Sequence, residues 1–410
     1  MEKKMYTKSE VLDFVEEEDV KFIRLAFFDV TGKQKNISIM PSELERAFED
    51  GIPFDASAVR GFEGPEKSDL LLLPDPSTLA IIPWRPTTGK VVRMFCNILN
   101  PDGTPYSKDC RTLLQNAYRR LKDECGIEMM IGTEVEFYLF KLDEKGEPTK
   151  EPFDHASYMD IAPDDHGENI RREICFTLEQ MGIAPEASHH EEGPGQNEID
   201  FHYSDALTAA DNVATFKWIV NTKAASNGLY ADFSPKPLAN NAGNGMHINI
   251  SYKKTESGAN NHNDDGKALL PYIVGGILKH IEEITYFLNP TQASYERLGS
   301  YKVSKYITWG KQNRSTLIRV PTSKKSSRIE LRSPDPQCNP YIALTLIIHA
   351  AIDGIKNKAD IPAATEDNLF DKATAEKLGL KTLPLSLEEA KKLATQSDFV
   401  KAVLGEIVVD

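Results

Sequence analysis

The sequence lacks the features that mark secreted and membrane proteins. Its five cysteines show no Cys-x-x-Cys pair and no disulfide-framework spacing, which predicts reduced thiols in a cytoplasm. The N-terminus, Met-Glu-Lys-Lys-Met, leads into a charged segment instead of the apolar run of a signal peptide. The most apolar stretches, near 268–278 and 341–352, are too short or too interrupted to span a bilayer. We therefore expect a cytoplasmic protein without a membrane partner.

Positive charge is scarce as well. The chain carries 48 Lys and Arg against 62 Asp and Glu, a net charge of −14, which argues against a nucleic-acid partner. The chain contains neither a Walker A loop nor a Gly-x-Gly-x-x-Gly motif after a strand, so neither standard glycine loop explains nucleotide binding. Any nucleotide site must therefore be built from other residues.

The chain is long enough, at 410 residues, for a large core and two domains. Residues 1–103 read as a strand-rich α+β module that ends at the polar turn within Asn100–Pro105. In residues 104–410, strands that carry acidic residues alternate with helices. The helices are predicted at 110–125, 168–181, 206–227, 267–287, 340–357 and 386–405, and loops at 141–157 and 254–266. These patterns predict an α+β fold whose second domain has a curved, mainly antiparallel sheet flanked by helices.

The stretch from Ser188 to Tyr203 predicts a hairpin with an acidic face. Gly193-Pro194-Gly195-Gln196 suits a type II turn, because Pro presets φ at the second position and Gly accepts a positive φ at the third. If the flanks pair about that turn, Glu191 lies opposite Glu198, with His189 and Asp200 on the same face. Two facing carboxylates repel each other unless a cation lies between them. For a single pair of this kind, a solvated hairpin is the simpler interpretation.

Three further strands repeat the pattern. Strand period two places Glu134 and Glu136 on one face, His247 and Asn249 on one face of another strand, and Glu330 between two arginines on a third. Each residue alone is more often exposed or part of a core. Together they indicate a site for a hard divalent cation such as Mg²⁺ or Mn²⁺.

An arginine cluster lies near these strands in the sequence. Its guanidinium groups suit phosphate or a substrate carboxylate, with a basic surface face as the alternative. The cluster consists of Arg297, Arg314, Arg319, Arg328 and Arg332.

The chain resembles the type I glutamine synthetases of bacteria and archaea over essentially its whole length. The motifs that carry this resemblance are Leu99–Pro105, His189–Asp200, Ser204–Asn212, Pro235–Leu238, Gly245–His247, Asn313–Ser315 and Arg328–Glu330. The resemblance implies an N-terminal β-grasp domain, a C-terminal catalytic domain, and a dodecamer of two hexameric rings with active sites between neighbouring subunits. It also implies an ATP-dependent ligase that joins L-glutamate and ammonia through γ-glutamyl phosphate.

The resemblance further implies two or more Mg²⁺ or Mn²⁺ ions per site and a role for each site residue. Glu136, Glu191 and Glu198 would hold one metal ion, and Glu134, His247 and Glu330 the other. Glutamate would be bound by Gly243, Arg297, Arg314 and Arg332, and ATP by Tyr203, Asn249, Ser251, Arg314, Arg319 and Arg328. The catalytic candidates are Glu191, Arg314 and Asp55, the last reaching into a neighbour's site to bind ammonium and help to deprotonate it.

The acceptor side departs from the family pattern. The family's loop carries a glutamate that serves the ammonium proton, whereas Lys302 takes this place in a loop that is one residue shorter. Ala58 and Ala242 also replace family residues on the substrate side. A lysine here would repel ammonium, which predicts weak use of it. The alternatives are a γ-glutamyl ligase for another amine, or another acid, and a non-catalytic regulatory or structural relative.

Overall fold

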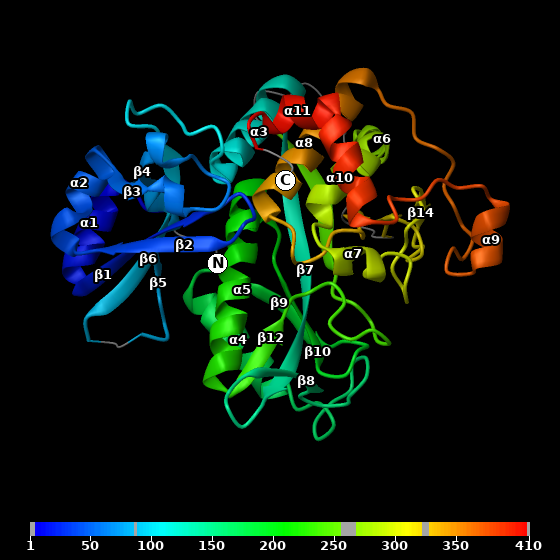
Figure 1. Cartoon of the computed structure of the whole chain (residues 1–410), viewed down its shortest axis with the longest axis horizontal. Coiled ribbons are helices and arrows are strands. Elements are labelled where there is room, and N and C mark those ends of the chain that lie inside the picture. The colour runs from blue at the N-terminus through cyan, green and yellow to red at the C-terminus, as the bar shows by residue number, and fades with distance from the viewer. Residues whose placement is uncertain (1–4, 86–87, 256–267, 322–327, 408–410) are drawn as a thin grey trace.

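The computed structural model describes residues 5–85, 88–255, 268–321 and 328–407, and confirms the α+β class (Figure 1). Most of the loop predicted at 254–266 lies outside the described residues. The N-terminal elements are α1 (Lys8–Glu17), β1 (Val20–Phe28), β2 (Gln34–Ile39), α2 (Leu44–Glu49), β3 (Ile52–Asp55), β4 (Asp69–Pro74), β5 (Ala80–Ile81) and β6 (Lys90–Leu99).

The N-terminal sheet has the order β2-β1-β6-β4-β3, with β5 added to β6. β1 pairs parallel with β6 and antiparallel with β2. Helix α1 begins at a capping box between Thr7 and Glu10, and its Val11 and Val15, four residues apart, lie on one buried face. These valines join a hydrophobic core that belongs to the N-terminal sheet.

The remaining elements form a larger sheet covered by helices. The strands are β7 (Ile127–Leu142), β8 (Pro148–Pro152), β9 (Pro185–His190), β10 (Gln196–Phe201), β11 (Ser204–Asp205), β12 (Leu229–Asp232), β13 (Met246–Lys254), β14 (Trp309–Lys311), β15 (Ile318–Val320) and β16 (Ile329–Leu331). The helices are α3 (Cys110–Cys125), α4 (Glu168–Gln180), α5 (Ala206–Ser226), α6 (Leu270–Leu288), α7 (Gln292–Arg297), α8 (Pro340–Asn357), α9 (Lys372–Lys377), α10 (Leu387–Gln396) and α11 (Asp398–Leu404).

The sheet follows the order β14-β15-β16-β13-β7-β10-β9 and is antiparallel apart from the β14–β15 pair. The prediction of a curved, mainly antiparallel sheet is therefore correct in strand direction. The predicted loop at 141–157 was wrong in part, because Pro148–Pro152 returns along β7 as the strand β8. Its charged sequence gave no hydrophobic alternation to reveal a strand.

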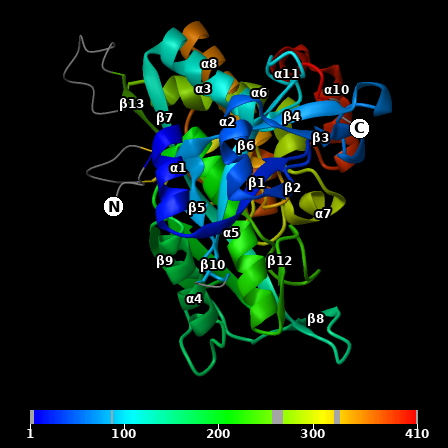
Figure 2. The same cartoon turned by 90° about the vertical axis from the view of Figure 1, so that its left-hand side faces the viewer.

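The long strand β7 runs through the middle of this sheet, and its side chains alternate between the two faces (Figures 1 and 2). Its odd-numbered residues from Ile127 to Leu139 are buried, and among them Phe137 meets Phe216 of α5 in the main core. Its even-numbered residues include Glu134 and Glu136 and point to the opposite face, as the alternation of a strand requires. Helices α3 and α5 cover the apolar face, so the acidic residues are left on the other one.

The β9–β10 hairpin forms with a different register from the predicted one. Glu198 lies opposite His189, and Glu191 N donates to Gln196 O at 2.8 Å, so the predicted pair of Glu191 with Glu198 was wrong. The turn itself is present: Gln196 N donates to Gly193 O at 2.9 Å and Gly195 has φ +69°. The loop is longer than this turn, because Gln196 pairs back to Glu191. A shift of two residues preserves the faces, since side chains alternate with period two.

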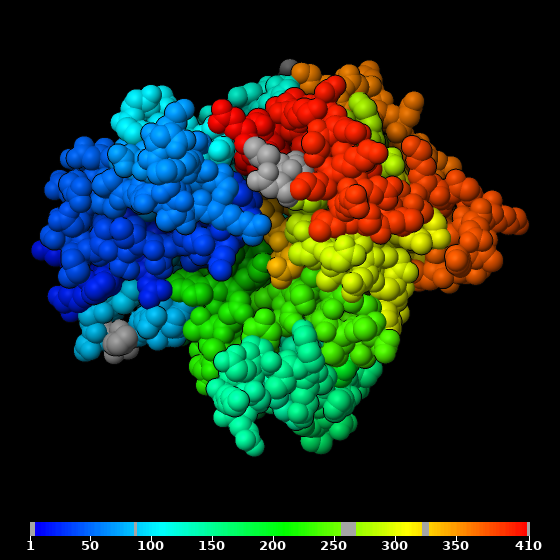
Figure 3. All heavy atoms as spheres, viewed as in Figure 1, coloured from blue at the N-terminus to red at the C-terminus, as the bar shows by residue number. Residues whose placement is uncertain are grey.

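A buried charged network joins the N-terminal sheet to the helices. Arg111 on α3 donates to Asp75 at 2.8 Å and to Asp211 on α5 at 3.0 Å, and Tyr341 on α8 donates to Asp211 at 2.7 Å. On the face seen in Figure 3 the N-terminal residues, in blue, lie directly against the rest of the chain. The boundary between residues 1–103 and 104–410 stays a prediction. In the described part of the chain, no helix combines the length and apolarity needed to cross a membrane.

Candidate active site

The predicted metal ligands converge on the face of the larger sheet that the helices leave open. In the strand register Glu198 lies opposite Glu136, His247 lies opposite Glu134, and Asn249 lies opposite Glu330. The ladder thus brings residues from four strands side by side. We call the set of Glu134, Glu136, Glu191, Glu198, His247 and Glu330 the metal face.

Glu134 on the metal face has two polar partners. Its Oε2 lies 3.2 Å from His247 Nδ1, and its Oε1 accepts a hydrogen bond from Asn249 Nδ2 at 2.8 Å. Burial raises the pKa of Glu134, but these contacts outweigh it and lower the pKa to about 2. Glu134 is therefore held as an anion beside an imidazole.

Glu136 and Glu198 are in the opposite situation. Burial raises the pKa of both carboxyl groups, and neighbouring carboxylates raise the pKa of Glu198 further, to well above its ordinary value. On the same face Asp200 has a pKa raised to about 7 by burial and by the charge of Glu134, and its Oδ1 has no hydrogen-bond partner among the described residues. A crowded set of buried acids is costly unless a cation compensates it.

The donor atoms fit a divalent cation. Ligand atoms of Glu134, Glu198 and His247 lie within 4.8 Å of one another, and so do those of His189, Glu191 and Glu198. Carboxylate oxygens with one imidazole suit Mg²⁺ or Mn²⁺. These groups differ from the predicted sets, because they include His189 and leave out Glu136 and Glu330.

Glu330 lies between two arginines. Its carboxylate is almost fully buried and forms ion pairs with Arg319 and with Arg332. His247 Nδ1 lies 3.8 Å from the same carboxylate. The metal face and the arginine cluster are therefore adjacent at Glu330.

Arg297 and Arg332 are buried guanidinium groups with spare donors. Arg297 donates to the carbonyls of Ser333 at 2.8 Å and Arg332 at 3.3 Å, yet the Nε atoms of both arginines have no partner among the described residues. Gly243 packs against Arg297, since a Cβ at position 243 would lie 3.1 Å from Arg297 Cγ. Two buried, under-satisfied cations beside a backbone segment suit a substrate with carboxylates.

The predicted ATP residues lie further along the same face. Arg328 donates to Asn249 Oδ1 at 3.0 Å, and Tyr203 stands beside Asn249 over Gly132 with 65% of its surface exposed. Ser251 follows on β13, two residues after Asn249. Arg314 is exposed, and no hydrogen bond or ion pair places it among the described residues. Burial lowers the pKa of Arg319, and the nearby charge of Arg314 lowers it further.

Asp55 is the one catalytic candidate that this chain does not bring to the metal face. It ends β3 of the N-terminal sheet, is exposed, and accepts hydrogen bonds from Ser57 N at 2.9 Å and Ser57 Oγ at 2.6 Å. Among the described residues no hydrogen bond or ion pair links it to the larger sheet.

The loops beside Glu191 form a second wall, which we call the acceptor rim: Glu192–Gly195, Ala242–Asn244 and Gly299–Val303. Tyr138 donates to Ala242 O at 2.6 Å, and Gln196 Nε2 donates to Gly243 O at 3.2 Å. Lys302 forms an ion pair with Glu192, a partner that the sequence did not predict.

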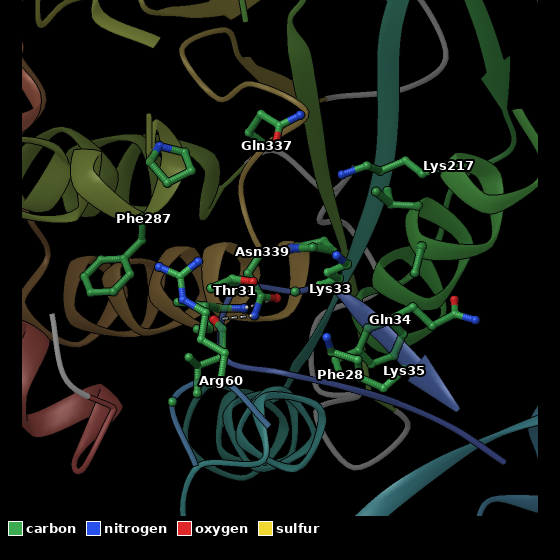
Figure 4. Close-up of a pocket in the computed structure, with 18 of the residues that line it drawn as sticks. Phe28, Thr31, Lys33, Gln34, Lys35, Arg60, Lys217, Phe287, Gln337 and Asn339 are labelled. Carbon is green, nitrogen blue, oxygen red and sulfur yellow. Dashed lines mark hydrogen bonds between the residues drawn. The ribbon is translucent and has the colours of Figure 1, made fainter. Parts of the chain in front are cut away.

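A cavity of about 1010 Å³ lies away from both walls, between β1, β2 and helices α5 and α8 (Figure 4). Its lining contains no carboxylate and six cationic residues: Arg24, Lys33, Lys35, Arg60, Lys108 and Lys217. Three of them already have partners in Asp29, Glu63 and the Pro336 carbonyl. Without hard-cation ligands this cavity does not compete with the metal face as the active site.

The sequence analysis placed His189 on the acidic face without giving it a role, and it missed Tyr138 and Gln196. His189 Nε2 lies 2.9 Å from Glu191, an interaction that raises the pKa of His189. Tyr138 and Gln196 support the acceptor rim. The strand period of two could have pointed to His189 and Tyr138 as site residues, because His189 shares a face with Glu191 and Tyr138 shares a face with Glu136.

The comparisons with known proteins agree with this geometry. The family model described as the glutamine synthetase β-grasp domain matches residues 19–101, and that of the glutamine synthetase catalytic domain matches residues 107–410. A glutamine synthetase of Methanosarcina mazei is 46% identical over 99% of this chain and 92% of the relative, and one of Staphylococcus epidermidis is 43% identical with the same coverage.

A solved structure supports the same assignment. The cryo-electron microscopy structure of Plasmodium falciparum glutamine synthetase has a TM-score of 0.86 at 25% identity, covering 100% of this chain and 95% of that one. Since the two domain models together match nearly the whole described length, and since archaeal and bacterial relatives match over 99% of this chain, the chain belongs to the glutamine synthetase family.

Proposed function

We propose that this protein is a glutamate–ammonia ligase, which uses ATP to form the γ-amide of L-glutamate through γ-glutamyl phosphate. The observation that carries the proposal is the junction at Glu330, where one buried carboxylate joins the metal face to Arg319 and Arg332. A ligase of this kind must bring a nucleotide phosphate and an amino acid together, and the adjacency of acidic and guanidinium groups at Glu330 supports that role.

The first task is to hold glutamate. Arg297 and Arg332 offer unpartnered Nε donors in a buried setting, where a charge-assisted hydrogen bond to a carboxylate is strong. Gly243 would supply backbone beside them. Arg332 also touches Glu330, so a bound substrate carboxylate would lie next to the metal face.

The second task is to activate the γ-carboxylate. A carboxylate is a poor electrophile toward amines, and phosphorylation gives it a good leaving group. Arg314, Arg319 and Arg328 would bind phosphate oxygens as charge develops on the transferring group. A divalent cation on the metal face would neutralise part of that charge. Tyr203, Asn249 and Ser251 would orient the nucleotide along β13.

The third task is to accept the amine. Ammonium must lose a proton before it can attack, and anionic side chains both attract the cation and accept its proton. We assign this role to Asp55 of a neighbouring subunit, because in its own subunit the hydrogen bonds of its carboxylate go to Ser57 and none of the described ones reaches the metal face. The proposal therefore includes an oligomer with shared sites, a dodecamer of two hexameric rings. It also includes Mg²⁺ or Mn²⁺ as the metal and a cytoplasmic location.

A panel of acceptors tests the proposed function. Phosphate release from ATP and Mg²⁺ is measured with L-glutamate plus ammonium, methylamine, ethanolamine or putrescine, and products are identified by mass spectrometry. We expect glutamine from ammonium as the main product. Faster turnover with another amine would replace ammonia as the acceptor, and no phosphate release with any acceptor would favour a non-catalytic relative.

A further inference from the structure

An ion pair links two of the three segments of the acceptor rim. The Lys302 ammonium meets the Glu192 carboxylate across a separation of 110 residues in sequence. The Lys302 side chain is 66% exposed and that of Glu192 is 31% exposed, so the pair stands at the mouth of the site.

The loop that carries Lys302 is compact by itself. Gly299 N donates to Val303 O and Val303 N donates to Ser300 O, both at 3.1 Å. Gly299 has φ +80° and Tyr301 has φ +47°, a conformation that costs a non-glycine residue energy. Lys236 secures the other side of the loop, with Nζ 3.3 Å from Ser300 Oγ and 4.4 Å from the Tyr301 ring centroid.

The turn that carries Glu192 is equally fixed. Glu192 N donates to Glu191 Oε2 at 3.0 Å, and Gly193 N donates to Gln196 Oε1 at 2.9 Å. A Cβ on Gly193 would lie 1.8 Å from the Tyr138 hydroxyl, so the turn touches the tyrosine that bonds Ala242. The ion pair thus connects two ordered segments, and one of them begins next to a metal-face residue.

We propose that the ion pair of Lys302 and Glu192 sets the charge that an incoming amine meets at the mouth of the site and fixes the loop that carries Lys302. Their ion pair holds the loop Gly299–Val303 against the β9–β10 turn, and Glu192 compensates the positive charge that Lys302 would otherwise present to an incoming ammonium ion. The inference rests on the proposed function and revises the expectation that Lys302 weakens the use of ammonium. It assigns the two partners different roles. Glu192 both neutralises the charge of Lys302 and holds the loop Gly299–Val303 against the turn, whereas Lys302 only holds the loop.

The two acceptors ammonium and hydroxylamine separate charge from geometry, because hydroxylamine is mostly uncharged at neutral pH. In Glu192→Gln, Lys302 loses its partner, and we expect the KM for ammonium to rise about two- to fivefold, the range of an exposed ion pair. The KM for hydroxylamine and the kcat with either acceptor should stay the same. In Lys302→Gln no positive charge is left uncompensated, since only the Glu192 carboxylate loses its partner, so the KM for ammonium should not rise.

The rate of chymotryptic cleavage after Tyr301 measures how firmly the loop Gly299–Val303 is held, and it needs no substrate turnover. Both single variants should be cleaved faster than the wild type, and the exchange Glu192→Lys with Lys302→Glu should restore both the cleavage rate and the KM. Glu151→Gln, which breaks an exposed ion pair with Lys141 away from the site, is the matched control.

Three results would overturn the inference: equal changes in KM for both acceptors, unchanged cleavage in the single variants, or no restoration by the exchange. Wild-type protein that forms neither glutamine nor the hydroxamate would instead contradict the proposed function. The cleavage result would still judge the closing role of the ion pair.

Discussion

The metal face and the acceptor rim are two walls of one site, built in different ways. Five of the six metal-face residues project from strands, and their neighbours are fixed by ladder hydrogen bonds. The rim consists of loops held by single contacts, such as Tyr138 to Ala242 and Lys302 to Glu192. A strand residue cannot be moved without breaking the ladder, whereas a loop residue can be exchanged locally. Two of the three expected departures from the family pattern, Lys302 and Ala242, accordingly lie in the rim.

The sharpest test of this contrast is Glu330→Ala. It removes a buried acid shared by Arg319 and Arg332, so we expect turnover to fall by about 100- to 1,000-fold and Mg²⁺ to bind more weakly. Titration calorimetry with Mg²⁺ and glutamine formation measure the two effects. Glu376→Ala, on the exposed helix α9, is the control. Unchanged Mg²⁺ affinity would remove Glu330 from the metal face.

Asp55→Ala tests whether the acceptor side is completed by a second subunit. The variant alone should be nearly inactive, because no other acid is assigned to collect the ammonium ion. Mixing it with Glu330→Ala subunits under conditions of subunit exchange creates interfaces with both intact residues, and activity should recover to about a quarter of wild type. Native mass spectrometry verifies the mixing. Mixed oligomers without recovery would count against a shared site.

Asp200→Asn tests the charge crowding of the metal face through stability. The folded pKa of about 7 lies above the ordinary 3.8, so the folded protein binds an extra proton between these values and loses stability as pH rises through them. Asparagine cannot ionise. Without metal, the variant should gain on the order of 2 kcal/mol over wild type above pH 7 and nothing below pH 4.

The measurement for Asp200→Asn is denaturant unfolding at pH 4, 6 and 8 with chelator present. Asp13→Asn, at an exposed position of α1, should show no such trend. Equal effects of Asp200→Asn at pH 4 and pH 8 would contradict the crowding of acids on this face.

Tyr138→Phe is expected to have the smallest effect, because it removes one contact of the rim. Ala242 O would lose a hydrogen bond of 2.6 Å, which costs about 1 kcal/mol and loosens the segment next to Gly243. We expect the KM for glutamate to rise about threefold with little change in kcat. Tyr295→Phe is the matched control, since the buried Tyr295 hydroxyl has no partner among the described residues. The same KM in both variants would show that this contact does not shape the glutamate site.

Much of the fold could be predicted from the sequence because its signals are local. The helix Cys110–Cys125 ends at Gly126, which has the positive φ of a C-cap, and the prediction had the same bounds. The polar faces of β7, β10, β13 and β16 follow from strand period alone, since alternation survives any pairing register. The motifs that carry the family resemblance are likewise read directly from the chain.

Only the tertiary structure decided which polar side chains meet. It paired Glu198 with His189 instead of Glu191, added β8 within a predicted loop, and placed Glu192 opposite Lys302. Some of these contacts join residues that are far apart in sequence. Others depend on how many residues a turn leaves unpaired. No local sequence pattern predicts the long-range contacts or the length of the loop. The sequence by itself determined the faces of the strands and the chemistry they carry. Packing decided which side chains are neighbours, because the strand period fixes the face to which a side chain points but the surrounding fold fixes what it meets there.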